Sequence, residues 1–97
     1  MLSTSEIIHS LKLFKKRSAA KYGIRTLGIF GSVARGQQDG DSDLDIFVTL
    51  DDADFFILER IREELEHLFP FQIDVIHFRD SLRESFKQKI QQDAIYI

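Results

Sequence analysis

The sequence contains no cysteine and no long apolar run. Without cysteine, neither a disulfide framework nor a thiolate metal site can form, although the redox compartment stays open. No stretch reaches the roughly eighteen uninterrupted apolar residues of a membrane helix, and residues 1–6 lack the basic start and following apolar stretch of a leader peptide. These absences predict a soluble, cytoplasmic protein without a membrane partner.

The length of 97 residues and the hydrophobic content of 43% suit one globular domain, residues 1–97. The net charge of −3 is unevenly distributed: residues 1–25 hold six basic side chains and one acid, whereas residues 37–66 hold eleven acids and two bases. Long nucleic acids are bound through many Lys and Arg contacts to phosphate, so the acidic middle argues against such a partner. The acidic middle is still compatible with binding a single nucleotide that arrives with magnesium.

The first half of the chain predicts a helix, a strand and a short helix. Ser3 and Glu6 form the S-x-x-E pattern of a capping box, apolar residues follow at helical spacing, and Gly23 supplies a stop after Tyr22. An apolar run over residues 26–30 predicts a buried strand that feeds a turn and a short helix at residues 32–36. The polar residues 37–41 are predicted to form a loop.

The second half predicts two strands and two helices. Residues 43–49 alternate as in a strand, with one apolar face (Leu44, Ile46, Val48) and a second face (Asp43, Asp45, Phe47). Acids at 51, 52 and 54 suit a helix start, and the stripe on this helix before Pro70 comprises Leu58, Ile61, Leu65 and Leu68. Residues 71–78 read as a third strand. Ser81 and Glu84 repeat the S-x-x-E cap before a last helix that carries Leu82, Phe86 and Ile90. The predicted order is α-β-α-β-α-β-α, with the nine phenylalanines in the core.

One segment of the chain has the pattern of a phosphate and metal site. Gly31 and Ser32 form a turn after an apolar run, where backbone N–H groups and a hydroxyl can approach phosphate. Asp43 and Asp45, two positions apart on a strand, project from the same face. Two magnesium ions ~3.5–4 Å apart, which stabilise in-line phosphoryl or nucleotidyl transfer, require several such carboxylates.

A third carboxylate is expected from a neighbouring strand, and Asp74 stands alone among apolar residues there. It could bind the activating metal and accept the proton of the attacking group. Taken alone, Asp74 reads equally well as an exposed residue at a strand edge. Alternating acids also suggest an EF-hand loop. Counted from Asp39, however, Leu44 stands where such a loop requires glycine, and Leu50 stands where it requires an acid at the twelfth position.

The pattern G-S-x-A-R-G-x5-S-D-x-D-[IL]-x-V, matched here without a gap, resembles that of the minimal nucleotidyltransferases, relatives of DNA polymerase beta. The resemblance implies an α/β (α+β) fold with a small mixed sheet and helices packed against it. It also implies ATP as donor, magnesium as cofactor and transfer of AMP to an acceptor hydroxyl. By position it makes Asp43 and Asp45 the metal pair, Asp74 the third carboxylate, and Gly31 and Ser32 the phosphate contacts.

Two further nucleotide-site candidates have alternative interpretations. Arg35 can contact the terminal phosphates, or it can brace the acidic loop through ion pairs. Ser42 can fix the turn or orient a neighbouring carboxylate. It is not expected to react, because no histidine stands near it to act as a base.

The resemblance further implies a partner protein, because family members often act as the antitoxin beside a HEPN-domain toxin and adenylylate a tyrosine of it. We therefore expect a hetero-oligomer in which AMP moves from ATP to a toxin tyrosine. Two alternatives remain: an antitoxin that neutralises its partner by binding alone, and nucleotidyl transfer to a small molecule. The apolar tail residues Ile90, Ala94, Ile95, Tyr96 and Ile97 are either a docking surface or part of the domain's own core.

Overall fold

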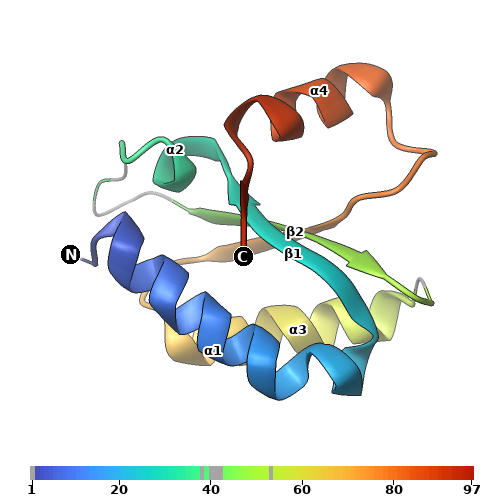
Figure 1. Ribbon diagram of the computed structural model, residues 1–97, viewed down its shortest axis with the longest axis horizontal. Coiled ribbons are helices and arrows are strands. Elements are labelled where there is room, and N and C mark those ends of the chain that lie inside the picture. The colour runs from blue at the N-terminus through green and yellow to red at the C-terminus, as the bar shows by residue number, and fades with distance from the viewer. Residues whose placement is uncertain (1, 38, 40–42, 53) are drawn as a thin grey trace.

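The computed structural model describes residues 2–37, 39, 43–52 and 54–97. Its elements, shown in Figure 1, are α1 (Thr4–Tyr22), β1 (Ile24–Phe30), α2 (Gly31–Ala34), β2 (Leu44–Leu50), α3 (Phe55–Leu68), β3 (Ile73–His77), α4 (Glu84–Asp93) and β4 (Ile95–Tyr96). The predicted alternation of helices and strands is confirmed, and a short fourth strand follows it. Among the described residues, no helix is both long enough and apolar enough to cross a membrane.

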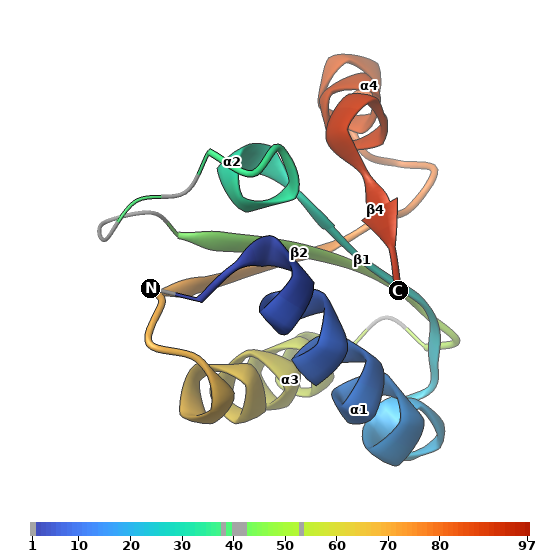
Figure 2. The ribbon, with the colours of Figure 1, turned by 60° about the vertical axis from the view of Figure 1, so that its left-hand side comes forward.

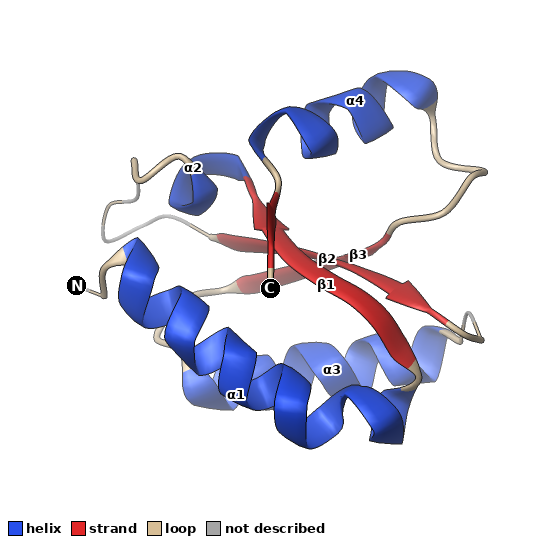
Figure 3. Cartoon of the chain, viewed as in Figure 1, coloured by secondary structure: helices blue, strands red, loops and turns tan. Residues whose placement is uncertain are grey.

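The four strands form one mixed sheet in the order β3-β2-β1-β4. β1 pairs antiparallel with β2 and with β4, whereas β2 and β3 are parallel. The mixed sheet implied by the family resemblance is therefore confirmed. Figure 3, coloured by secondary structure, shows the strands crossing between two sets of helices.

The two faces of the sheet are covered unequally. α1 and α3 lie side by side against one face, while α4 lies over the other, as Figures 1 and 2 show from two directions. The larger core lies between the sheet and the α1–α3 pair and includes fully buried Leu11, Ile46 and Leu65. Buried Phe30, Phe47 and Ile90 form a smaller core beneath α4. The alternation predicted for β2 is confirmed, because Leu44, Ile46 and Val48 belong to the larger core and Phe47 to the smaller one.

The predicted limits of the first helix are confirmed. Ser3 accepts a hydrogen bond from the Glu6 backbone at 3.1 Å, and the Glu6 carboxylate accepts one from the Ser3 backbone at 3.0 Å. At the other end Gly23 adopts φ 67°, a left-handed conformation that glycine tolerates and other residues rarely do. Both capping signals in the sequence therefore act as predicted.

Helix α3 begins at an Asp54 cap, whose side chain accepts a hydrogen bond from the Phe56 backbone at 2.8 Å. Ile61 and Leu65 are buried as predicted, and Leu58 packs partly against them. Leu68 is 43% exposed, so its assignment to the buried stripe was wrong: Phe69, just beyond the helix, is buried next to it.

The assignment of every phenylalanine to the core was also wrong. Phe55 and Phe56 are 69% and 74% exposed. They occupy the first turn of α3, and their rings contact each other edge to face with centroids 6.0 Å apart.

The second predicted capping box does not form. Helix α4 begins at Glu84, its N-cap is Arg83, and no side chain caps it. The Ser81 hydroxyl instead accepts a hydrogen bond from Arg79, in a turn closed by a bond from Leu82 N–H to the Arg79 carbonyl. The helix therefore starts after Leu82. Leu82 lies in the preceding loop and still packs against the smaller core.

Residues 94–97 add to the sheet. Ile95 pairs with Ile29 and Tyr96 with Gly28, and the Ile97 N–H donates to the Leu27 carbonyl. Ile95 and Ile97 pack against the larger core, whereas Tyr96 is 63% exposed. Of the two interpretations, burial on the domain itself is confirmed for these two isoleucines.

Candidate functional site

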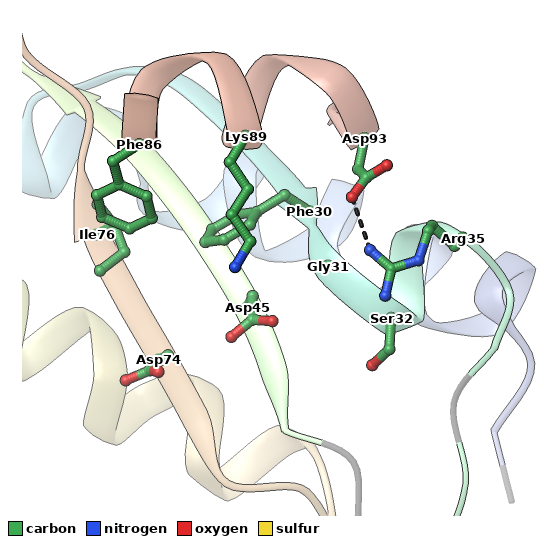
Figure 4. A pocket seen from close by; sticks show the side chains of 10 residues that line it. All are labelled: Phe30, Gly31, Ser32, Arg35, Asp45, Asp74, Ile76, Phe86, Lys89 and Asp93. Atoms are coloured by element: carbon green, nitrogen blue, oxygen red, sulfur yellow. Dashed lines mark hydrogen bonds and ion pairs between the residues drawn. The ribbon is translucent and has the colours of Figure 1, made fainter. Parts of the chain in front are cut away.

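Two carboxylates lie side by side on the parallel strands β2 and β3. β2 and β3 are paired so that Asp45 stands directly opposite Asp74. Because side chains alternate along a strand and Leu44 and Ile46 face the larger core, Asp45 projects toward the face under α4. Figure 4 shows both carboxylates on that side. The predicted juxtaposition of these two side chains is therefore present.

The turn between β1 and α2 approaches the same carboxylates. Gly31 adopts φ 76°, and a Cβ at this position would overlap the Asp45 carboxylate. Only glycine satisfies both conditions. The next residue, Ser32, brings its hydroxyl to the same side (Figure 4). The predicted turn thus places backbone and a hydroxyl next to Asp45.

These groups border an open cleft of about 370 Å³ between the sheet, α2 and α4. Figure 4 shows its lining residues: Phe30, Gly31, Ser32, Arg35, Asp45, Asp74, Ile76, Phe86, Lys89 and Asp93. The lining combines charged side chains (Arg35, Asp45, Asp74, Lys89, Asp93) with apolar ones (Phe30, Ile76, Phe86). A cleft of this mixed character accommodates a ligand that has both charged and apolar parts.

The charge on Asp45 is unfavourable in this structure. Burial raises the pKa of the Asp45 carboxyl above its ordinary value, and the negative charges of Asp74 and Asp43 raise it further. Lys89 and Arg35 act in the opposite direction. A cluster of carboxylates held together against their repulsion is typical of a site that binds a cation.

Arg35 is held by an ion pair. Its Nη1 lies 2.7 Å from Oδ2 of Asp93 on α4, and its Nε donates to Gln37 at 3.1 Å. Arg35 also lines the cleft. Arg35 therefore makes an ion pair with α4, while bracing of the acidic loop and contact with phosphate both stay predictions.

Of the remaining two predicted site residues, Asp43 lies within the described part of the chain. Asp43 is exposed immediately before the strand and is not among the residues that line the cleft. Its charge nevertheless affects Asp45. Ser42 lies outside the described residues.

The oxygen donors at this site fit magnesium. Mg²⁺ prefers oxygen ligands and usually takes only one or two carboxylates, with phosphates and water completing its shell. Asp45 and Asp74 supply that number. Across the described ranges, no set of three or more His, Cys, Asp or Glu side chains is arranged to hold a metal by itself. The site therefore suits a metal that arrives with a phosphate ligand better than a metal held by protein alone.

Sequence analysis did not identify the contribution of α4. Lys89 and Asp93 line the cleft, but the helical spacing shows only that Phe86, Lys89 and Asp93 share one stripe. Which element that stripe faces depends on how α4 packs over the sheet. Ile76 follows Asp74 by two positions on β3, so strand alternation could have found it.

Comparison with known proteins identifies the chain. The family described as polymerase beta, nucleotidyltransferase matches residues 12–97. A chain from Methanocaldococcus jannaschii assigned as a protein adenylyltransferase is 35% identical over 101 residues, covering 100% of both chains. The protein adenylyltransferase MntA of Thermococcus cleftensis is 30% identical over 98 residues, covering 100% of this chain and 98% of the relative.

Solved structures share the fold. A chain assigned to the minimal nucleotidyltransferases superposes with a TM-score of 0.78 at 25% identity, covering 97% of this chain and 95% of that one. A toxin-antitoxin crystal structure with AMP-PNP gives 0.72 at 20% identity, covering 98% and 72%. A complex of the tri-AMPylated Shewanella oneidensis HEPN toxin with an MNT antitoxin gives 0.58 at 16%, covering 88% and 70%.

The family match spans most of the chain, and the relatives extend along its full length. The mixed sheet and its helices agree with the fold of the solved structures. The chain therefore belongs to the polymerase beta nucleotidyltransferase family, and it is a nucleotidyltransferase.

Proposed function

We propose that this protein transfers AMP from ATP to a tyrosine hydroxyl of a HEPN-domain toxin and so serves as the antitoxin of the pair. The observation that carries the proposal is the placement of Asp45 beside Asp74, in a cleft whose opposite wall is the Gly31–Ser32 turn. Nucleotidyl transfer needs carboxylates for the metal ions and groups that hold the phosphates, and this cleft brings both together. Relatives over the full length of the chain are assigned as protein adenylyltransferases, which supports a protein as acceptor.

The site residues divide the tasks of the proposed reaction. Asp43 and Asp45 would hold two magnesium ions together with the phosphates, and Asp74 would be the third carboxylate. Gly31 and Ser32 hold the phosphate chain through the backbone and the hydroxyl. Arg35 and Ser42 complete the nucleotide site. Magnesium, when bound, supplies positive charge to the phosphates and to the attacking oxygen.

The chemical step is an in-line displacement at the α-phosphorus of ATP. The acceptor oxygen forms a bond to this phosphorus, and the bond from phosphorus to the α,β-bridging oxygen breaks. Pyrophosphate leaves with the electron pair of that bond. Asp74, exposed on the edge strand β3, takes the proton of the acceptor hydroxyl.

A partner protein fits the open form of the cleft. A volume of about 370 Å³ leaves little wall to enclose both a nucleotide and an acceptor. Two structural neighbours come from toxin-antitoxin structures, one with AMP-PNP and one with a tri-AMPylated HEPN toxin. A hetero-oligomer in which the toxin completes the site accounts for both observations.

The test is an intact-mass measurement on a candidate acceptor. A suitable candidate is a small helical HEPN protein encoded next to this chain's gene, incubated with the chain, ATP and Mg²⁺. We expect the acceptor to gain the mass of one or more AMP units, at a tyrosine located by peptide mapping. The variant Asp45→Asn is the matched control and should transfer none.

The alternatives predict different masses. If the two proteins form a complex but the acceptor mass stays unchanged, neutralisation by binding alone replaces the proposal. If AMP appears on a small-molecule hydroxyl and not on protein, the proposed acceptor class is wrong.

A further inference from the structure

One stripe of helix α4 forms the upper wall of the cleft. Phe86, Lys89 and Asp93 follow at helical spacing, and all three line the cleft. Ile90, next to this stripe, is buried in the smaller core and fixes which way the stripe faces. Figure 4 shows Phe86 above Ile76, Lys89 above Asp45 and Asp93 above Arg35. Among the described residues that line the cleft, the one lysine, Lys89, therefore lies opposite Asp45.

The two cations of the cleft differ in their partners. Arg35 is neutralised by Asp93, whose side chain is only 17% exposed. Within the part of the chain that the structure describes, Lys89 makes no hydrogen bond or ion pair. Its ammonium group points into the cleft, and its charge lowers the pKa of Asp45. Lys89 is thus a cation directed at the site and free to bind an anion.

We propose that Lys89 binds the β- and γ-phosphates of the donor nucleotide, the part that leaves as pyrophosphate. This inference rests on the proposed function. The phosphate chain lies between the Gly31–Ser32 turn on one side and α4 on the other. Lysine suits this position because its ammonium is a compact charge with three donors, able to follow phosphate oxygens as the chain moves.

The charges in the cleft require such a group. Once Arg35 and Asp93 are paired, the lining retains two acids, Asp45 and Asp74, and one base, Lys89. The two carboxylates would serve the metal and the acceptor proton, which leaves Lys89 to offset charge on the phosphates. When the α,β-bridging oxygen takes the electron pair of the breaking bond, the added charge falls on this same group of oxygens. A cation held there stabilises the leaving group.

The test measures ligand affinity in the full-length chain with Mg²⁺ present. The variants are Lys89→Met, which keeps length and removes charge, and Lys89→Arg, which keeps the charge. The probes are AMP-PNP and pyrophosphate, which contain the β- and γ-phosphate positions, and AMP, which lacks them. AMP-PNP is titrated by calorimetry, and the other two compete against it.

Lys87→Met is the matched control. Lys87 lies two positions away on α4, pairs with Glu84 at 3.3 Å and does not line the cleft. It is a lysine of the same helix whose loss should leave nucleotide binding unchanged. Its thermal midpoint, measured beside that of Lys89→Met, separates effects on folding from effects on binding.

We expect Lys89→Met to weaken AMP-PNP and pyrophosphate about 10-fold each, the size of one lost charge-assisted hydrogen bond. Lys89→Arg should restore most of the affinity, and AMP should bind Lys89→Met as it binds the wild type. Equal loss for AMP would overturn the inference, because the contact would then be to the α-phosphate or nucleoside. Unchanged affinity for all three probes would also overturn it. Failure of the wild type to bind AMP-PNP would instead remove the proposed function, and this inference with it.

Discussion

The two faces of the sheet have different roles, although β2 contributes side chains to both. On the face covered by α1 and α3, β2 contributes Leu44, Ile46 and Val48 to a core of fully buried apolar side chains. On the other face it contributes Asp45 and Phe47, the first to the cleft and the second to the small core under α4. The comparison shows that alternation along a single strand can separate stability from chemistry.

The separation also runs along the strand. Phe47 is covered by aromatic neighbours, with Phe78 and Tyr96 at centroid distances of 6.2 and 5.3 Å. Asp45, two positions earlier on the same face, opens to the cleft. The site therefore occupies one end of a face whose other end is packed. We therefore expect substitutions at the cleft end to affect mainly activity and those at the packed end to affect mainly stability.

The first prediction concerns the charged end of that face. Asp43→Asn combined with Asp45→Asn should reduce AMP transfer by roughly a thousandfold or more, because metal stabilisation is worth several kcal/mol in the transition state. Incorporation of labelled AMP into the acceptor measures the effect, and a circular-dichroism spectrum controls for folding. Undiminished transfer would mean that these carboxylates are not the metal site.

The second prediction compares the packed cores. Leu65→Ala, on the α3 face, should lower the free energy of unfolding by about 2–5 kcal/mol because it opens a cavity in a fully buried site. Phe86→Ala, on the partly open α4 face, should cost only about 1 kcal/mol because part of its ring is already in contact with water. Urea unfolding of the two variants tests the comparison. Equal losses would show that the α4 face carries as much of the stability.

The third prediction separates backbone strain from overlap with the site. Gly31 and Gly36 both have positive φ, 76° and 72°, but only at Gly31 would a Cβ meet another group, the Asp45 carboxylate. Gly36→Ala should cost about 1 kcal/mol of stability and leave AMP-PNP binding unchanged. Gly31→Ala should cost roughly 2–3 kcal/mol and abolish detectable AMP-PNP binding. Similar behaviour of the two variants, in thermal melts and nucleotide titrations, would argue that position 31 matters only for its backbone.

The fourth prediction is the smallest and concerns pH. The folded-state pKa of Asp45 is raised above its ordinary value near 3.8, mainly by burial. A raised carboxyl pKa means that the folded state holds the proton longer, so stability is lost as the pH rises through the folded value. Asp45→Asn removes this loss. We expect the variant to be more stable than the wild type at neutral pH.

The pH dependence of that difference is the control. The gain in the free energy of unfolding should shrink as the pH falls toward the ordinary value of an aspartate and then level off. Melting curves of both proteins across the acidic range measure it. A variant that is less stable than the wild type at neutral pH would show that Asp45 contributes to folding.

The sequence predicted the features that depend on neighbouring residues. The capping box at Ser3, the stop at Gly23 and the two faces of β2 need only local spacing, and all three are present. The S-x-x-E pattern at Ser81 has the same spacing, yet Ser81 is bound to Arg79 and the helix starts later. Identical local patterns thus gave one correct and one wrong prediction, because competing hydrogen bonds decided between them.

The features that the sequence did not provide depend on packing between distant elements. Phe55 and Phe56 are exposed, although Ile57 and Leu58 directly after them pack against the larger core. The ion pair from Arg35 to Asp93 joins residues 58 positions apart. The position of Lys89 over the cleft follows from the placement of α4, which no spacing rule specifies. Asp74 could be paired in advance with Asp43 and Asp45, the proposed metal ligands, through the expectation of a neighbouring strand.

The parallel register of β2 and β3 has one further consequence. A slip of a single residue would bring hydrophobic Ile73 or Val75 beside Asp45 in place of Asp74, and would turn every side chain of β3 to the opposite face. Such a misfolded chain could retain its helices and much of its compactness, but it would lack the paired carboxylates. Specific activity therefore also reports on folding. It depends on the fraction of molecules in which β2 and β3 are in register, which spectroscopy of secondary structure cannot measure.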